Sequence, residues 1–477
     1  MNRHWPILVA AVWALVGSTG YAQIDLNRFQ RQLEQIQRET RMLVDPQVPA
    51  DQRALLDYGG FVTFNFLAVD DVLQETSILR QTDLNGYLRV NLDGVHEFFL
   101  RARTSYIDFN TGDSFDAHGD DLVEPTLDRG HYRFDLQRYA AAYEGKSIPY
   151  NVIVQGGRQL VHWANGLTLS EEIDGGLVQL SYEPVTLDIL AGMKRDSSPD
   201  IDSSRPDFTD DTDRQFYGGM LSVQVDPRHR PFVYGIVQRD GNSDVLTTGG
   251  VTTQFDYDSH YVGFGSTGSF GDNLIYGAEF VYQGGDGLSN SFDPGTGAGV
   301  VQTDEQIEAL AMDLRLDYLL NDGNRTRFSG ELIVASGDTD RVHTTDTFGG
   351  NATGTDDHAF NAFGLIDTGL AFNPNVSNLL LVRLGGSTFP LPTIECFRRL
   401  QVGVNFFVFN KLNRNAPIDE TTNTKTFLGW ESDLYMNWQL TSDLSWAVRY
   451  GVFLPGDAIA VDHDARHFVF SGVTIAF

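Results

Sequence analysis

The sequence predicts an all-β fold: a transmembrane antiparallel β-barrel of about 18 strands, preceded by a short N-terminal helix. Two observations lead to this prediction. The last eleven residues, 467–477, alternate apolar and small or weakly polar side chains with a period of two and end on Phe477. The same period continues from Leu56 onward, in segments that are joined alternately by short and long connections. Strands of about ten residues with this alternation are typical of membrane barrels.

The composition limits the class of protein. The chain has 477 residues, with 48 Gly, 18 Tyr, 32 Phe, one Cys and a formal net charge of −30. Abundant glycine and aromatic residues fit barrel turns and interfacial aromatic belts. The acidity argues against nucleic acid as a partner. After the N-terminus no apolar run approaches the roughly 18 residues of a membrane helix, and the lone Cys396 cannot form an intramolecular disulfide.

The chain divides into three predicted parts: a signal peptide at 1–22, a periplasmic helix and linker at 23–55, and the barrel at 56–477. Arg3 precedes an apolar run, and Gly20-Tyr21-Ala22 offers small residues at a cleavage site, the pattern of secretory signals. Residues 24–43 place apolar side chains at helical steps of three and four. This helix is a simple lead-in, a lumen plug or a coiled-coil seam.

The cleanest strand is predicted at 427–440, where one face is apolar and the other carries Glu431 and Asp433. Eighteen segments follow this pattern: 57–68, 82–92, 95–108, 129–144, 149–159, 173–182, 185–195, 215–225, 231–240, 257–269, 273–283, 306–319, 324–336, 377–386, 397–409, 426–440, 443–454 and 466–477. An even strand number with alternating connections places both termini in the periplasm and the long acidic loops outside. Residues 337–376 could hold a further strand or helix, or fold inward as a lid that narrows the lumen, and 387–396 is long for a periplasmic turn.

If the apolar faces contact lipid, the opposite faces line a lumen. These faces carry many basic residues, namely Arg89, Arg101, Arg103, Arg133, Lys194, Arg315, Arg325, Arg327, Arg399 and Arg449. Rings of basic residues favour anions in a pore, and the guanidinium fork binds carboxylates bidentately. The alternative is that these arginines pair with acidic neighbours across the wall and only stiffen the barrel.

Two resemblances sharpen this prediction. Residues 467–477 resemble the C-terminal insertion signal of bacterial outer-membrane barrels, apart from Phe470 where that signal usually has a polar residue. This resemblance implies recognition of the last strand, ending at Phe477, by the barrel-assembly machinery. Residues 156–182, 357–381 and 427–456 resemble the alginate-export family of outer-membrane porins, although the family pattern lacks a helix like that of 24–43.

The family resemblance implies an 18-stranded monomeric barrel with a basic constriction that conducts an anionic polysaccharide such as a polyuronate. It places Arg158 on the substrate path, with Glu431 and Asp433 as its counter-charges. The loop that follows Gln159, residues 162–165 (HWAN), is less basic than a polyanion path suggests.

The predicted function is therefore an outer-membrane porin of a Gram-negative-type bacterium that passes anionic oligo- or polysaccharide, as in alginate export. Its surroundings would be the lipid bilayer and lipopolysaccharide, with no cofactor and no metal. The alternative is a general or sugar-selective porin for nutrient uptake. The sequence contains neither HExxH nor GxSxG, so we predict no enzyme activity, although a histidine site assembled from loops is a further alternative. An occluded barrel that serves as a structural anchor is another.

Overall fold

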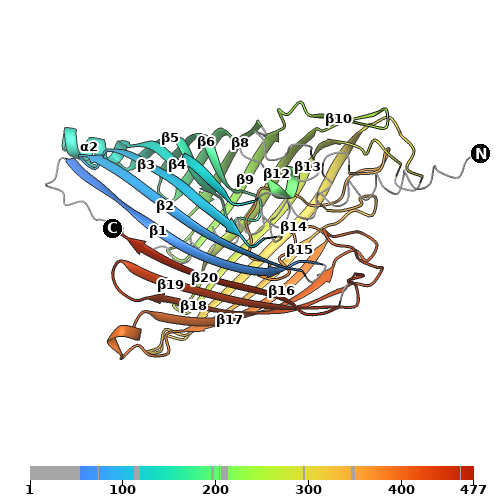
Figure 1. Cartoon of the computed structure of the whole chain (residues 1–477). Helices are drawn as coiled ribbons and strands as arrows, with labels where there is room; N and C mark the ends of the chain where they lie inside the picture. Colours follow the sequence, from blue (N-terminus) through green and yellow to red (C-terminus); the bar gives the residue numbers. More distant parts are fainter. Residues whose placement is uncertain are drawn as a thin grey trace, which may run out of the picture.

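Eighteen antiparallel strands close into one barrel in the computed structural model (Figure 1). The structure describes residues 54–72, 75–111, 119–194, 198–202, 205, 213–293, 296–344, 347, 350–461 and 463–477. The predicted signal peptide and the helix at 24–43 lie outside these residues. Among the described residues, no helix is both long and apolar enough to cross a membrane.

The barrel strands are β1 (Ala54–Asp70), β2 (Thr76–Leu92), β3 (His96–Phe109), β4 (Asp121–Asp135), β5 (Tyr150–His162), β6 (Ser170–Tyr182), β7 (Val185–Lys194), β8 (Arg214–Val223), β9 (His229–Arg239), β12 (Tyr257–Phe270), β13 (Leu274–Leu288), β14 (Asp304–Leu319), β15 (Arg327–Ala335), β16 (Leu379–Thr388), β17 (Leu400–Lys411), β18 (Phe427–Gln439), β19 (Leu444–Pro455) and β20 (Arg466–Ala476). A separate hairpin is formed by β10 (Val245–Thr248) and β11 (Val251–Gln254). The helices are α2 (Leu136–Glu144), α3 (Pro199–Asp202) and the 3-10 turn η2 (Glu395–Phe397).

The barrel closes where β1 pairs with both β2 and β20. Gly60 and Phe477 exchange two backbone hydrogen bonds, each 2.9 Å long. A Cβ added to Gly60 would lie 2.8 Å from the Phe477 ring, so glycine allows the last residue to approach the first strand closely. The C-terminal strand therefore completes the wall.

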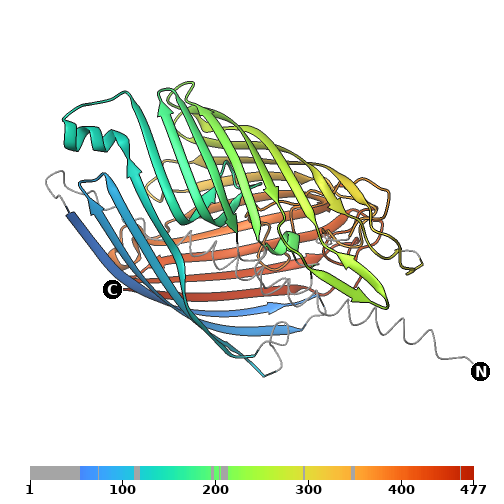
Figure 2. The ribbon, with the colours of Figure 1, turned by 90° about the horizontal axis from the view of Figure 1, so that it is seen from above.

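The two ends of the barrel differ. The end that carries α2, η2 and the C-terminus, called the turn end below, lies opposite the end that carries the β10–β11 hairpin, called the loop end (Figures 1 and 2). The connection from β15 to β16, residues 336–378, belongs to the loop end and contains no additional barrel strand among its described residues.

All eighteen predicted segments overlap barrel strands, but the strand predicted at 129–144 is wrong in its second half. There the chain forms α2, which begins with the Asp135 side chain accepting a hydrogen bond from the Arg138 N–H and ends at Gly145 in the left-handed region. Asp at the N-cap and Gly after the last turn are common helix boundaries. The hairpin β10–β11 was not predicted, because it lies in a segment interpreted as a loop.

The strand faces follow the predicted alternation. On β18, Trp430 and Leu434 are exposed on the outer surface, whereas Glu431 and Asp433 are buried inside. On β20, Phe470 faces inward and is buried with Leu67 and Leu79. This contact gives the physical reason for the aromatic residue at the position where the insertion signal usually has a polar one.

Aromatic side chains gather at the turn end. Trp438 contacts Trp446 and Phe397, with ring centroids 6.4 Å and 5.0 Å apart. Tyr139 and Tyr143 of α2 lie 5.1 Å apart. Aromatic belts of this kind mark membrane–water interfaces in membrane proteins.

Candidate functional site

Two segments fold from the loop end into the interior of the barrel. The first inner loop, residues 163–169, joins β5 to β6, and the second, residues 357–378, is part of the long β15–β16 connection. They pair with each other: the Ser170 N–H donates to the Phe363 carbonyl at 2.8 Å, and the Phe363 N–H donates to the Thr168 carbonyl at 3.0 Å. The two inner loops therefore form one connected constriction.

Glu279 of β13 holds the first inner loop. Its carboxylate accepts hydrogen bonds from the Asn165 backbone N–H at 2.8 Å and from the Tyr234 hydroxyl at 2.5 Å. The Glu279 side chain is fully buried. Charge-assisted hydrogen bonds to backbone N–H groups satisfy a buried carboxylate, which would otherwise be costly to desolvate.

Glu431 of β18 holds the second inner loop in the same way. Its two oxygens accept from three successive backbone N–H groups, those of Leu370, Ala371 and Phe372, at 2.6, 2.7 and 2.8 Å. Gly369 has φ 109°, and a Cβ placed there would lie 3.0 Å from the Glu431 carboxyl group. Glycine at this position therefore lets the backbone wrap around the carboxylate.

Apolar clusters hold the inner loops against the wall. Phe363 packs edge-on against Phe216, and the surrounding cluster includes Trp163, Leu167 and Ile201. On the other side of the interior, Phe372 stacks on Phe453 with centroids 4.2 Å apart, and Leu370 packs against the cluster around Phe468 and Phe470. The second inner loop thus contacts three different apolar clusters, through Phe363, Phe372 and Leu370.

A cavity of about 370 Å³ remains between the second inner loop and the wall. Its lining is polar and comes from β15 to β19 and from the loop: Arg327, Ser329, Asp367, Gly369, Leu370, Arg383, Gly386, Ser387, Gln401, Asn405, Asp433, Tyr435, Asn437 and Arg449. Cavities of a few hundred Å³ with convergent polar groups are typical of ligand sites.

Three arginines line this cavity, and each has partners. Arg383 is held between Asp367 of the inner loop at 2.6 Å and Glu331 of the wall at 2.5 Å. Arg449 donates to the Met436 carbonyl at 3.2 Å and lies over the Tyr435 ring. Arg327 pairs with Asp317 at 2.7 Å, and half of its side chain is exposed.

Comparison with known proteins identifies the family. The family model described as "Alginate export" matches residues 70–470. The chain belongs to the alginate export family. It is therefore an outer-membrane β-barrel of the porin type. Among curated protein sequences, none matches this chain.

Solved structures share the barrel fold at low identity. Acinetobacter baumannii OccAB1 is 10% identical, with a TM-score of 0.52, over 88% of this chain and 96% of that one. Pseudomonas aeruginosa OccK5 (OpdH) and OccK8 (OprE) are each 12% identical, with TM-scores of 0.50, over 88% of this chain and 98% of theirs.

The arginines predicted for the lumen of this alginate export family member mostly pair with acidic residues of neighbouring or nearby wall positions. The pairs are Arg89 with Glu97 at 2.6 Å, Arg103 with Asp83 at 3.1 Å, Arg133 with Asp135 at 3.8 Å, Arg315 with Glu331 at 2.5 Å, and Arg101 with Asp128. Of the predicted path residues, the structure brings only Arg327, Arg449 and Asp433 to the described cavity. Pairing across the wall, the alternative considered from the sequence, accounts for most of the others.

Two predicted residues lie in turns rather than on wall faces. Arg325 lies between β14 and β15 with φ 51° and covers the Phe389 ring. Arg399 directly precedes β17. The predicted strands 324–336 and 397–409 began three residues too early, which placed both side chains on the wall.

Arg158, which the family resemblance implied for the substrate path, is not among the residues that line the described cavity. It lies opposite Asp174 on β6, and its guanidinium donates to that carboxylate at 2.7 and 2.9 Å. It alternates along β5 with Gln159 and Val161, which are buried inside, so strand register puts Arg158 on the outer face. Its expected counter-charge Glu431 instead binds the second inner loop.

Sequence reasoning missed Arg383, Glu279 and the first inner loop, whereas an inward fold of residues 337–376 was among its alternatives. Arg383 alternates with Val382 and Leu384 in the predicted strand 377–386, so periodicity could have placed it inside. Glu279 could have been found in the same way. The inner loops have no periodic pattern, and nothing local in the sequence indicates their position.

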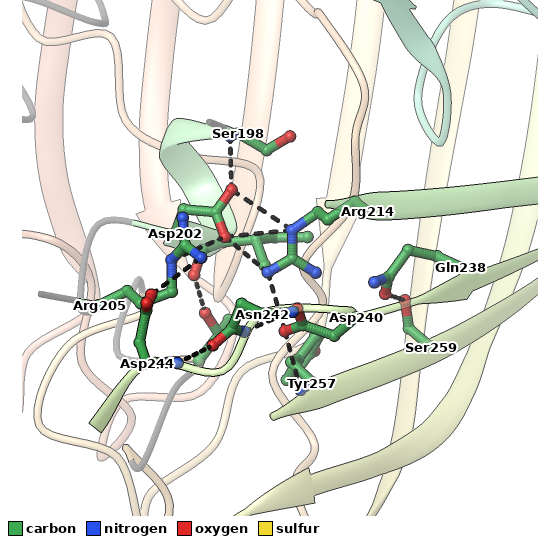
Figure 3. A network of polar contacts seen from close by, with 12 residues as sticks. Ser198, Asp202, Arg205, Arg214, Gln238, Asp240, Asn242, Asp244, Tyr257 and Ser259 are labelled. Carbon is green, nitrogen blue, oxygen red and sulfur yellow. Dashed lines mark hydrogen bonds and ion pairs between the residues drawn. The ribbon is translucent and has the colours of Figure 1, made fainter. Parts of the chain in front are cut away.

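A buried polar network fixes a third connection, between β7 and β8 (Figure 3). Arg214 donates to Asp202 at 2.5 Å and to Asp240 at 3.2 Å, and all three side chains are buried. Arg205 pairs with Asp244 at 3.0 Å. Because a buried charge needs a partner, this network holds the α3 segment over the inner loops at the loop end.

Proposed function

We propose that this outer-membrane channel passes anionic saccharides through the cavity beside the second inner loop, as an alginate-like exporter would. The single observation that supports the proposal is the lining of that cavity, which combines Arg327, Arg383 and Arg449 with several neutral hydrogen-bonding groups. Arginine suits sugar carboxylates because its planar fork donates two parallel hydrogen bonds. Amide and hydroxyl side chains suit sugar hydroxyl groups.

The cavity lining carries more arginines than carboxylates, although Asp317 and Glu331 from outside the lining pair with Arg327 and Arg383. Three lining arginines face two lining carboxylates, Asp367 and Asp433. Asp367 is already paired with Arg383. An arginine that exchanges its wall partner for a carboxylate of the solute would favour anions, because the guanidinium fork binds carboxylates bidentately. We also propose that the apolar outer face contacts the bilayer and lipopolysaccharide, with the turn end in the periplasm and the strand ending at Phe477 recognised by the barrel-assembly machinery.

A general or sugar-selective uptake porin is the second candidate. The neutral lining residues Ser329, Gln401, Asn405 and Asn437 favour it, because they can bind an uncharged sugar without any arginine. The two candidates therefore differ in whether the charge of the solute matters.

The first prediction concerns Arg327. In planar bilayers under a KCl gradient, we expect the wild-type channel to prefer chloride and to be blocked by short polyuronate. Arg327→Ala should weaken the block about fivefold, because a half-exposed charge pair contributes about 1 kcal/mol. Block constants and reversal potentials measure the effect.

Arg325→Ala is the matched control, since this arginine lies two residues away but outside the cavity. It should leave the block unchanged. Cation selectivity with no block by polyuronate, but with block by neutral oligosaccharides, would transfer the assignment to the uptake porin. Absence of current in the wild type would indicate an anchor rather than a channel.

A further inference from the structure

We propose that Glu431 is a positioning residue that sets the size limit of the channel, by fixing the tip of the second inner loop, residues 369–373, across the interior. The inference rests on the proposed channel function but goes beyond it. The tip supplies Gly369 and Leu370 to the cavity lining, so the position of the tip determines how wide the passage is.

The bond between the tip and the wall is a carboxylate in a nest of backbone N–H groups. Three consecutive residues, Leu370 to Phe372, direct their N–H groups at the Glu431 carboxylate, at 2.6 to 2.8 Å. Successive N–H groups with this convergence form anion-binding concavities, and hydrogen bonds to an ionised acceptor are roughly twice as strong as neutral ones. A single side chain thus holds three peptide groups.

The backbone on both sides of the tip takes conformations that need such a partner. Gly369 has φ 109° and Asn373 has φ 39°. Left-handed conformations are uncommon outside glycine and persist where surrounding contacts impose them. The Thr368 hydroxyl reinforces the turn by donating to the Asn373 side chain at 2.8 Å. The tip is therefore a tight turn that is built around the carboxylate.

The other glutamate, Glu279, has a different role. It holds a loop of seven residues, 163–169, which joins two paired wall strands. That loop also contributes Trp163, Leu167 and Leu169 to the largest apolar cluster. The tip at 369–373 lies near the end of a far longer connection, residues 336–378. Phe372 and Leu370 also pack the tip against the wall, but loss of Glu431 would leave three consecutive backbone N–H groups without this acceptor. Among backbone N–H groups, loss of Glu279 would affect only those of Asn165 and Leu167. We therefore expect the larger displacement at the tip.

The test is the size limit of the open channel. We expect Glu431→Ala to raise single-channel conductance about twofold, since conduction depends on the narrowest constriction, and to admit larger neutral oligosaccharides in liposome swelling. Glu431→Gln should fall between wild type and alanine, because its amide has one accepting oxygen in place of two. Glu279→Gln is the matched control and should change the limit little.

A reversible disulfide separates displacement of the tip from general damage to the barrel. A Cβ added at Gly451 would lie 2.9 Å from the Leu370 Cβ and 2.8 Å from Asp433 Oδ1. The roughly 3.8 Å separation of a disulfide therefore needs a shift of the two cysteines apart and a rotation of the Asp433 side chain, so the Leu370→Cys and Gly451→Cys pair without Glu431→Ala is the control for that change. Leu370→Cys and Gly451→Cys would be combined with Cys396→Ser and Glu431→Ala. Under oxidation this variant should show wild-type conductance, and reduction should raise it to that of Glu431→Ala alone.

The outcomes are distinct. If the wild type conducts but Glu431→Ala has the same conductance and size limit, the positioning role of Glu431 is refuted, while the proposed channel function is unaffected. If the cross-linked variant keeps its high conductance under oxidation, displacement of the tip is not the cause of the increased conductance, and the positioning role of Glu431 is again refuted. If the wild type carries no current, the channel function itself fails.

Discussion

Asp256, between β11 and β12, lies among other carboxylates at the loop end. Partial burial of the carboxyl group is the largest cause that raises its pKa to about 6, and repulsion from Asp258, Asp240 and Asp304 adds to it. In an unfolded chain an Asp has a pKa of about 3.9. The folded state therefore holds the proton more tightly, and the contribution of this group to stability decreases as pH rises from about 4 through 6.

We expect Asp256→Asn to protect this region at pH 7.5, where the carboxylate is charged, and to have little effect at pH 5. The ratio of variant to wild-type rates of proteolytic cleavage within residues 241–256 measures this. Asp226→Asn, at an exposed turn, serves as the control. A ratio that is the same at both pH values would contradict the raised pKa.

Arg158 illustrates which properties of a single residue can be predicted from the sequence. Its charge and its neighbour Asp174 can be identified, but the face of the strand depends on register. Gly157, with φ 128°, lies so close to the β4 backbone that a Cβ there would be 2.2 Å from the Gly130 carbonyl oxygen. Local sequence does not specify this close approach, which appears only when β4 and β5 pair.

At the scale of elements, β4 departs most from the prediction. It pairs with β5 only from Gly130 to Asp135, and the described residues Asp121–Arg129 pair with β3 alone. Two irregularities in the β3–β4 register and Pro125 accompany this separation. Proline and bulges belong to edge strands. The acidic stretch 109–128 had been interpreted as a loop, because this charge and proline obscure the alternation.

Residues 121–129 of β4, which have no described strand partner on the β5 side, lead to a prediction. Backbone groups without partners are not tolerated in hydrocarbon, so we expect this half of β4 to be in water. Those amides of 121–129 that point away from β3 should exchange hydrogen at nearly the rate of an unstructured peptide, whereas amides of 130–135 should be protected.

Residues 102–107 of β3 provide the internal control, because this stretch is paired with strands on both sides. Uniform protection across β4 in hydrogen-exchange mass spectrometry would show that the edge is covered and would contradict the prediction.

For the whole molecule, periodicity predicted the barrel and its strand number because successive side chains of each strand face the lipid side and the lumen side in turn. The constriction has no such local signal. Glu431 binds a backbone N–H 61 residues away, and Glu279 binds one 114 residues away. Contacts of this kind arise from closure of the barrel, so they become visible only in the structure.

The charge of the whole chain is also distributed unequally between the two ends. The sequence between β3 and β4, residues 110–120, contains three acidic residues and no Lys or Arg, and that between β7 and β8, residues 195–213, contains seven Asp and two Arg. The turn-end connections are more balanced, as in 389–399, where Glu395 accompanies Arg398 and Arg399. An acidic entrance repels anions over a Debye length.

This asymmetry predicts that polyuronate blocks the channel better from the turn end than from the loop end in about 10 mM salt, where the Debye length is about 30 Å. The difference should vanish in about 1 M salt, where that length is about 3 Å. A neutral oligosaccharide of the same size should show no salt-dependent asymmetry. If the asymmetry for polyuronate were equal at both salt concentrations, its cause would be the shape of the interior and not charge. A salt-dependent asymmetry would mean that anions enter more readily from the turn end, which is the direction that export requires if that end faces the periplasm.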